Sequence, residues 1–247
     1  IDPTLSFFEV TLFDAKGRKI EIRFDLPSNF PHSAPNVTSN LPVQISFDWD
    51  SQSAKLVHIV EKYSTVIPSF DLLWTELEDI DKNTRVIDPR NPSLNCYMRL
   101  LYLTPQLWLQ IEIKPLRPSW RPVIKFKGAD QLKREMQQKY EAGVSQWNPN
   151  KSVRENIEAI LEMKLPKRIE ETEDNSEREC PICFCERFGG ELPEIVCENP
   201  QCAKHFHRTC LLDWLRENRR MEQSFNIVYG TCPNCSTKIQ CDMTYLM

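Results

Sequence analysis

The hydrophobic positions near the start of the chain first alternate and then take up a helical spacing. Apolar residues recur at every second position over 20–26 and again over 43–49, which predicts strands that each bury one face. The spacing i, i+3, i+4, i+7 follows over 56–63 and over 70–77, which predicts two helices. We therefore expect a sheet followed by two helices in residues 1–90.

The same order of patterns recurs after residue 90. Alternation over 107–113 is followed by helical spacings over 132–140 and 153–161, and Ser152 and Glu155 could form a capping box before the last helix. An offset of 87 residues maps Ile20 onto Leu107, and it also maps the prolines at 31 and 35 onto those at 118 and 122. Strands that are segregated from helices predict an α+β fold. We expect two similar lobes, over residues 1–90 and 91–165.

The periodicity is lost over residues 166–178, where glutamate and aspartate accumulate. Such a composition is typical of a solvated connector, because few apolar side chains are available to pack. This segment predicts a flexible hinge, and it separates the lobes from a C-terminal module over residues 179–247.

Cysteine is concentrated in that module, which holds nine of the ten cysteines of the chain. Four spaced pairs suit Zn²⁺, because two donors separated by a few residues can reach one ion from a single turn. We expect closed, structural zinc sites for two ions. The predicted ligands are Cys180, Cys183, Cys197, Cys202, His207, Cys210, Cys232 and Cys235.

The expected pairing is interleaved, with the first and third pairs on one ion and the second and fourth pairs on the other. Cys185, His205 and Cys241 could compete as ligands, and His205 is the strongest competitor. A disulfide framework is the alternative, but the paired spacing and the interposed histidine favour a metal in a reducing compartment.

The overall composition is that of a soluble protein, with 247 residues, a net charge of −4, 40% hydrophobic and 27% charged residues. No apolar run is long enough to span a membrane, and the start at Ile1 predicts a fragment. Direct DNA binding is disfavoured by the net charge, although one basic stretch could support it, with Lys114, Arg117, Arg121, Lys125 and Lys127.

The residues between the zinc ligands resemble those of RING fingers. Trp214 lies four residues past Cys210, whereas Gly230 stands where a PHD finger is expected to carry tryptophan. In RING ubiquitin ligases such positions form the docking surface for a ubiquitin-conjugating enzyme. The resemblance, together with the expected apolar patch, assigns that role to Ile182, Phe184, Trp214, Leu215 and Pro233. The alternative is that Trp214 and Phe184 belong to the core of the module.

The segment Phe30-Pro31-x3-Pro35 resembles the proline motif of RWD domains, which are relatives of ubiquitin-conjugating enzymes. A conjugating enzyme needs a thiol nucleophile, but the first 95 residues contain no cysteine. Cys96 precedes the main strands of the second lobe, and we interpret it as a small buried apolar residue. The lobes are therefore expected to bind proteins, not to conjugate ubiquitin, and we predict no catalytic residue.

The whole chain resembles the Fanconi anaemia group L family of ubiquitin ligases, in its double RWD-like segment, in Cys-Pro-Ile-Cys at 180–183 and in the stretch 223–227. The resemblance implies a RING-type ligase in the nucleus, and also in the cytoplasm, that lacks an N-terminal conjugating-enzyme-like domain here. It implies monoubiquitination of the Fanconi group D2 and I proteins in DNA crosslink repair. The implied partners are a ubiquitin-charged conjugating enzyme, these substrates and other Fanconi core complex subunits.

Ser236 departs from the pattern of many active RING ligases, which carry Arg or Lys just after the eighth ligand. We expect this chain to activate ubiquitin weakly and to rely on specificity for one conjugating enzyme. The alternative from another functional class is a non-catalytic adaptor, in which the lobes tether proteins and the zinc finger docks on a partner.

Overall fold

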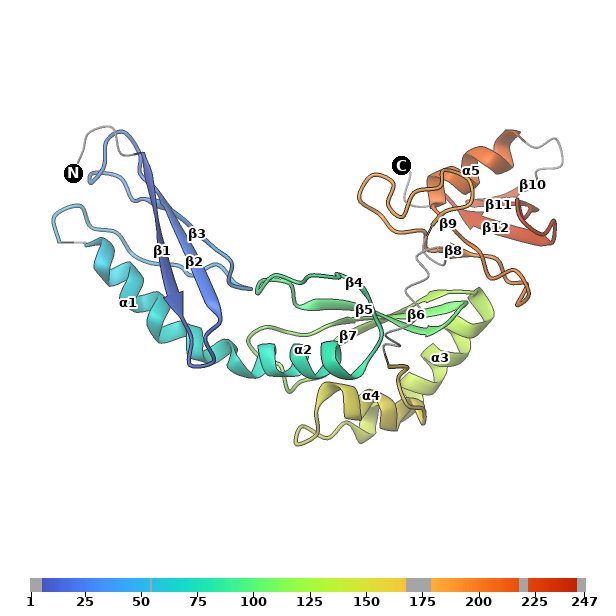
Figure 1. Ribbon diagram of the computed structural model, residues 1–247, viewed down its shortest axis with the longest axis horizontal. Coiled ribbons are helices and arrows are strands. Elements are labelled where there is room, and N and C mark those ends of the chain that lie inside the picture. The colour runs from blue at the N-terminus through green and yellow to red at the C-terminus, as the bar shows by residue number, and fades with distance from the viewer. Residues whose placement is uncertain (1–5, 54, 168–178, 218–221, 244–247) are drawn as a thin grey trace.

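The computed structural model describes residues 6–53, 55–167, 179–217 and 222–243. Two lobes and a C-terminal module follow one another along the long axis of the molecule in chain order (Figure 1). Among the described helices, none has the length and apolar character needed to cross a bilayer. The predicted α+β class, with two sheet-and-helix lobes and a small terminal module, is confirmed.

The first lobe is built on an antiparallel sheet with the order β1-β2-β3, formed by Phe7–Phe13, Lys19–Asp25 and Asn36–Ser39. The predicted alternation over 20–26 is observed in the middle strand, where Ile20, Ile22 and Phe24 are fully buried. Helix α1 (Leu56–Val66) contributes Ile59 and Tyr63 to the same core cluster. A single turn of 3-10 helix, η1 (Ile67–Phe70), then leads into helix α2 (Asp71–Asn83).

The strand predicted over 43–49 is wrong, because this segment joins no described ladder. Its alternation is nevertheless real: Val43, Ile45, Phe47 and Trp49 are half-buried against the core, while the residues between them are exposed. The indole nitrogen of Trp49 donates to the carbonyl oxygen of Pro31 at 2.9 Å. An extended chain that lies along a core gives the same period of two as a paired strand, so the pattern could not distinguish them.

The second lobe has a four-stranded antiparallel sheet with the order β4-β5-β6-β7, formed by Val86–Asp88, Met98–Thr104, Leu107–Glu112 and Val123–Gly128. Helix α3 (Asp130–Gly143), a short 3-10 turn η2 (Val144–Gln146) and helix α4 (Val153–Leu161) follow. The predicted capping box is present, because the Ser152 hydroxyl accepts from the Glu155 N–H and the Glu155 carboxylate accepts from the Ser152 N–H.

The two lobes share one hydrophobic core that runs from Ile20 to Leu165. Helix α2 joins them, since Arg154 of α4 forms an ion pair with Asp79 at 2.8 Å. The offset of 87 residues places the middle strands β2 and β6 in correspondence, but it carries α1 into the turn between α3 and α4. Strand β4 pairs with β5, so residues 86–88 extend the second sheet although the predicted boundary lies at residue 90. That boundary stays a prediction.

The C-terminal module contains a short ladder of β8 (Ile195–Val196) and β9 (His205–Phe206), helix α5 (Arg208–Glu217) and a sheet of β10 (Glu222–Ser224), β11 (Ile227–Thr231) and β12 (Lys238–Asp242). Its apolar core is small, and its largest fully buried members are Phe206, Leu211, Leu212 and Leu215. Four cysteines of the predicted zinc sites are buried with them. The acidic connector predicted over 166–178 lies almost wholly outside the described residues.

Candidate metal centres and the junction with the second lobe

The first and third predicted ligand pairs meet in space. The donor atoms of Cys180, Cys183, His207 and Cys210 all lie within 4.8 Å of one another. A tight turn presents the first pair, because the Phe184 N–H donates to the Cys180 carbonyl oxygen at 2.8 Å and Phe184 has a positive φ of 57°. The second pair comes from the entry into α5. A single ion could therefore join the loop at 180–185 to the helix.

His207 faces this first cluster through one ring nitrogen. Its Nδ1 atom lies 3.3 Å from the Cys183 sulfur and 3.8 Å from the Cys210 sulfur. Its Nε2 atom points to the Glu186 carbonyl oxygen at 3.4 Å. A hydrogen bond from the opposite nitrogen orients a ligating imidazole and selects its tautomer. Nδ1 is therefore the donor atom that the structure turns toward a metal.

The second and fourth pairs form the other cluster, with Cys197, Cys202, Cys232 and Cys235 again within 4.8 Å of one another. The sulfurs of Cys197 and Cys235 are 3.6 Å apart, and those of Cys202 and Cys232 are 3.9 Å apart. A disulfide requires about 2.05 Å. All ten cysteines are free, so the structure does not support the disulfide alternative.

The donor sets fit two structural zinc ions, as predicted. One cluster offers three sulfurs and one imidazole nitrogen, the other offers four sulfurs, and each set is closed at four donors. Soft thiolate donors suit Zn²⁺ and do not suit Mg²⁺ or Ca²⁺. Each ion would tie together segments far apart in the sequence, because a ligand pair from another region stands between the two pairs of each cluster.

Several thiols of these clusters have shifted pKa values. Burial, together with the neighbouring thiols, raises the pKa of Cys210 to about 12. Burial also raises the pKa of Cys232 to about 12, whereas a hydrogen bond with the Thr237 hydroxyl lowers the pKa of Cys235 to about 6. Zinc binds thiolates, so it must displace the thiol protons, and its positive charge would stabilise the buried thiolates that result.

The three competing residues lie outside both clusters. Cys185 is exposed, and its thiol donates to the Cys183 carbonyl oxygen. Burial raises the pKa of Cys241 to about 11, and this thiol lies against the carbonyl oxygen of Arg208. His205 turns away from the clusters, because its Nε2 atom lies 2.7 Å from the Pro105 carbonyl oxygen.

The candidate surface for a conjugating enzyme is only partly as predicted. Phe184 is 77% exposed and Trp214 is 43% exposed, so neither belongs to the core of the module. Ile182 and Pro233 are partly exposed. The predicted exposure of Leu215 is wrong, because this side chain is fully buried and lies against Gly230 on β11. The helical spacing alone did not show that α5 turns Leu215 inward beside Leu211 and Leu212.

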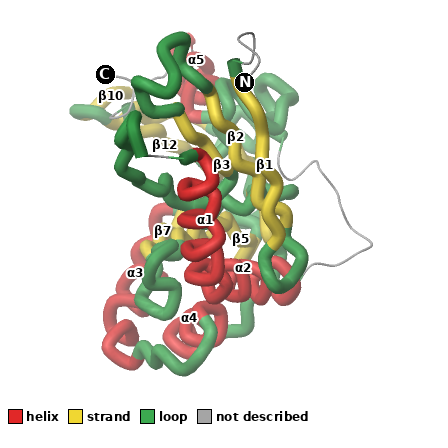
Figure 2. The backbone as a smooth tube through the Cα atoms, turned by 90° about the vertical axis from the view of Figure 1, so that its left-hand side faces the viewer, coloured by secondary structure: helices red, strands yellow, loops and turns green. Residues whose placement is uncertain are grey.

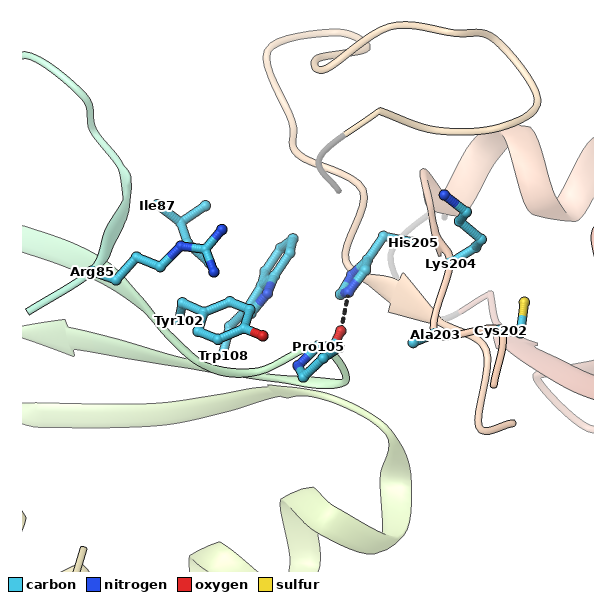
Figure 3. A pocket seen from close by; sticks show the side chains of 9 residues that line it. All are labelled: Arg85, Ile87, Tyr102, Pro105, Trp108, Cys202, Ala203, Lys204 and His205. Carbon is cyan, nitrogen blue, oxygen red and sulfur yellow. Dashed lines mark hydrogen bonds between the residues drawn. The ribbon is translucent and has the colours of Figure 1, made fainter. Parts of the chain in front are cut away.

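His205 is instead part of a junction between the module and the second lobe (Figure 3). Its ring stacks on Trp108 of β6 with 4.3 Å between centroids and 4° between planes. Both side chains are almost completely buried. The module and the helices α3 and α4 lie on opposite sides of the second sheet (Figure 1, Figure 2). Leu192 of the module packs against the cluster of Ile87, Leu100 and Trp108. A cavity of about 170 Å³ remains between Arg85, Trp108 and His205.

Polar contacts extend this junction in both directions. Gln106 donates to the carbonyl oxygen of the ligand Cys197 at 2.8 Å, and Arg90 pairs with Glu186 at 2.9 Å. Further ion pairs link Arg187 to Asp88 and Lys127 to Glu194. The acidic composition of residues 166–178 predicted a hinge that would let the module swing, but the described residues show the module docked on the second lobe. A pairing across about 100 residues leaves no local pattern, so the sequence did not reveal it.

Three family models match consecutive parts of the chain. The FANCL UBC-like domain 2 matches residues 1–70, the FANCL UBC-like domain 3 matches residues 72–168, and the FANCL C-terminal domain matches residues 176–244. Together they cover nearly the whole chain in the order of its two lobes and its module. The chain belongs to the FANCL family.

Individual members of the FANCL family agree with this assignment. The mouse E3 ubiquitin-protein ligase FANCL is 31% identical over 244 residues, which are 99% of this chain and 65% of that protein. The Drosophila melanogaster E3 ubiquitin-protein ligase Fancl is 26% identical over 259 residues, covering all of this chain and 66% of that protein. The chain thus spans slightly less than two thirds of the length of these relatives.

A more distant relative and a solved structure add to the picture. Mouse E3 ubiquitin-protein ligase listerin is 24% identical over 229 residues, which cover 85% of this chain and 12% of that protein. A crystal structure of FANCL superposes with a TM-score of 0.63 at 20% identity, covering 97% of this chain and 68% of that one. This likeness shows that the FANCL fold extends over both lobes and the module.

Proposed function

We propose that the chain is the central and C-terminal part of a RING-type ubiquitin ligase. The module would dock a ubiquitin-conjugating enzyme charged with ubiquitin, and the lobes would hold a protein substrate. One observation supports this most strongly: two interleaved donor clusters hold the turn bearing Phe184 and the helix bearing Trp214 in one small domain. The mouse and Drosophila relatives are named as E3 ubiquitin-protein ligases.

Two zinc ions, held by the eight Cys and His residues of the clusters, would supply the rigidity of the docking platform. We assign contact with the conjugating enzyme to Ile182, Phe184, Trp214 and Pro233, and we remove Leu215 because it is buried. Exposed aromatic and aliphatic anchors on a rigid surface typically carry most of the binding energy of an interface.

The mechanism would be positional. A ligase of this type holds the thioester-charged enzyme and the substrate together, which replaces a bimolecular encounter by an oriented one. The chain needs no nucleophile of its own for this step. Cys96 is half-buried, and its thiol lies against the Met98 carbonyl oxygen at 3.6 Å, as suits a structural residue.

The docked module adds a geometric element to this proposal. Trp108 and His205 join the second lobe to the domain that would receive the conjugating enzyme. A substrate on the lobes would then meet the thioester at a limited range of distances. By the family resemblance, the substrates are the Fanconi group D2 and I proteins, and the setting is crosslink repair in the nucleus together with other core complex subunits.

The test is reconstitution of ubiquitin transfer with the chain, ubiquitin, activating enzyme and a panel of conjugating enzymes. We expect conjugates with a narrow subset of the panel. Trp214→Ala and Ile182→Ala should each weaken docking by about 30-fold, as expected for a 2 kcal/mol hot spot, while two zinc ions stay bound. Leu72→Ala, at an exposed apolar position on α2, serves as the matched control. No conjugates above background with any enzyme would support the adaptor alternative.

A further inference from the structure

The connection between β6 and β7 exposes an unusual combination of side chains. Residues 113–125 contain four cations and no carboxylate, and they include three large apolar side chains that are exposed to solvent. Leu116 is 66% exposed, Trp120 is 53% exposed and Val123 is 43% exposed. We call this set the basic-aromatic patch; its members are Lys114, Leu116, Arg117, Trp120, Arg121, Val123 and Lys125.

The cations of the basic-aromatic patch are not paired with carboxylates of the described residues. Among the residues that the structure describes, Lys114, Arg117, Arg121 and Lys125 form no ion pair, whereas Arg18, Arg99 and Arg154 each bind carboxylates. The guanidinium of Arg117 lies 4.3 Å from the centre of the Trp120 ring. In a chain with a net charge of −4, this stretch is a local concentration of positive charge.

The loop that carries the patch is held in one shape. The indole nitrogen of Trp147 donates to the Ser119 carbonyl oxygen at 3.1 Å, and two tight turns are closed at Arg117 and at Trp120. Pro118 and Pro122 are buried beneath the exposed residues. A loop with fixed backbone loses little conformational entropy when it binds, which favours recognition.

The chemistry of the basic-aromatic patch fits an acidic protein segment better than a nucleic acid. Phosphate recognition would use the cations, but it would leave the aliphatic side chains of Leu116 and Val123 without a partner. A segment with carboxylates around one or two apolar side chains would match both halves of the patch. Arginine and tryptophan are also the residue types most enriched at energetic centres of protein interfaces.

We propose that the basic-aromatic patch binds an acidic protein segment that carries apolar side chains. The carboxylates of the segment would form ion pairs with Arg117 and Arg121, and one of its apolar side chains would pack on Trp120. The pairing of β6 with β7 shows where the patch lies relative to the module. The pair Glu112–Val123 lies at the end of this ladder near the patch, and the pair Leu107–Gly128 lies at the end where the module docks. Five residues of strand separate them, about 17 Å. A bound partner would therefore lie beside the module without covering it.

The test is direct binding to the whole chain, measured by fluorescence anisotropy, so it does not depend on ligase activity. The main probe is a labelled twelve-residue peptide of Asp and Glu with one Leu and one Phe. A second peptide has both apolar residues replaced by Ser, and a third probe is a single-stranded DNA of twelve nucleotides. We expect the first peptide to bind, with affinity that falls as salt is raised, and the other two probes to bind at least tenfold more weakly.

Variants assign the binding to the basic-aromatic patch. Arg117→Glu combined with Arg121→Glu, and Trp120→Ser alone, should each weaken the first peptide by about 30-fold or more. Lys55→Glu combined with Lys62→Glu, and Leu72→Ser, make matched changes at exposed sites of the first lobe and should leave the affinity unchanged. Binding that is absent, that persists in both patch variants, or that is as tight for DNA as for the peptide overturns the proposal.

Discussion

Trp108 should decide whether the C-terminal module stays docked on the second lobe. Its indole is 3% exposed and stacks on His205, and it lies in a cluster with Ile87, Leu100 and Leu192. Replacing it with alanine removes the stack and opens a space at the junction. We expect the module to detach more often while both zinc ions and both lobes remain folded.

The size of this effect depends on how much of the Trp108 side chain packs within its own lobe and how much packs on the module. Replacement of a buried tryptophan by alanine costs roughly 3–5 kcal/mol. Part of this loss lies within the lobe, against Ile87 and Leu100. The ring stack itself contributes about 0.5–1.5 kcal/mol. Taking about 1.4 kcal/mol for the junction, the ratio of detached to docked molecules should rise about tenfold.

Hydrogen exchange measures this ratio at the amides near the junction. In Trp108→Ala, exchange at residues 104–107 and 195–206 should be about tenfold faster than in the wild type, because exchange follows local opening. Amides of α1 should change far less. Trp108→Leu is the matched control: it keeps apolar volume without a ring, so it should lower overall stability less while still losing the stack.

Two outcomes would refute this reasoning. Unchanged exchange at the junction in Trp108→Ala, with a lowered melting temperature, would show that Trp108 stabilises only its own lobe. A uniform increase over the whole chain would show that lobe and module unfold as one unit. Gln106→Ala, which removes a single hydrogen bond to the Cys197 carbonyl oxygen, should give a smaller increase, since such a bond contributes about 1 kcal/mol.

Four further predictions concern the metal sites and the lobes. Cys197→Ser should lower the zinc content measured by native mass spectrometry below two ions and destabilise the module, because a structural zinc site contributes roughly 10–16 kcal/mol in small peptides; two retained ions would contradict this. Ser236→Arg should raise autoubiquitination in the reconstituted assay, because the guanidinium of the new side chain could donate hydrogen bonds to ubiquitin and to the conjugating enzyme together. An unchanged rate would contradict the expectation that Ser236 makes this chain a weak activator of ubiquitin. Ser152→Ala should lower the free energy of unfolding by about 1 kcal/mol through loss of the α4 cap, with Ser152→Thr as a milder control. Burial opposes ionisation of Glu158, but hydrogen bonds from Lys164 and from the Leu165 N–H outweigh it, so the pKa of Glu158 lies below the ordinary 4.5. The contribution of Glu158 to the free energy of unfolding is therefore present above about pH 4.5 and is lost as the pH falls further. Glu158→Gln should make stability depend less on pH over that range in acid unfolding measurements.

The periodic elements and the metal sites followed from local pattern. Helical spacing over 153–161 with its capping box predicted α4, because both signals depend on neighbours within one or two turns. Four ligand pairs predicted two closed sites, since the reach of a tight turn limits which donors can share an ion. Alternation at 43–49 indicated a half-buried extended chain but not its lack of a ladder partner.

The docking of the module depended on tertiary structure alone. His205 looked like a rival ligand because it stands two residues from His207, yet its ring lies on Trp108, about a hundred positions earlier in the chain. The spacing to Cys210 favoured His207 as the ligand, but no local pattern showed that the ring of His205 would stack on a neighbouring lobe. Leu215 is a similar case, because α5 presents one side to β11 and the other to solvent. Local patterns identify which residues can form elements and sites, whereas the packing of one element on another selects the side chains that remain exposed.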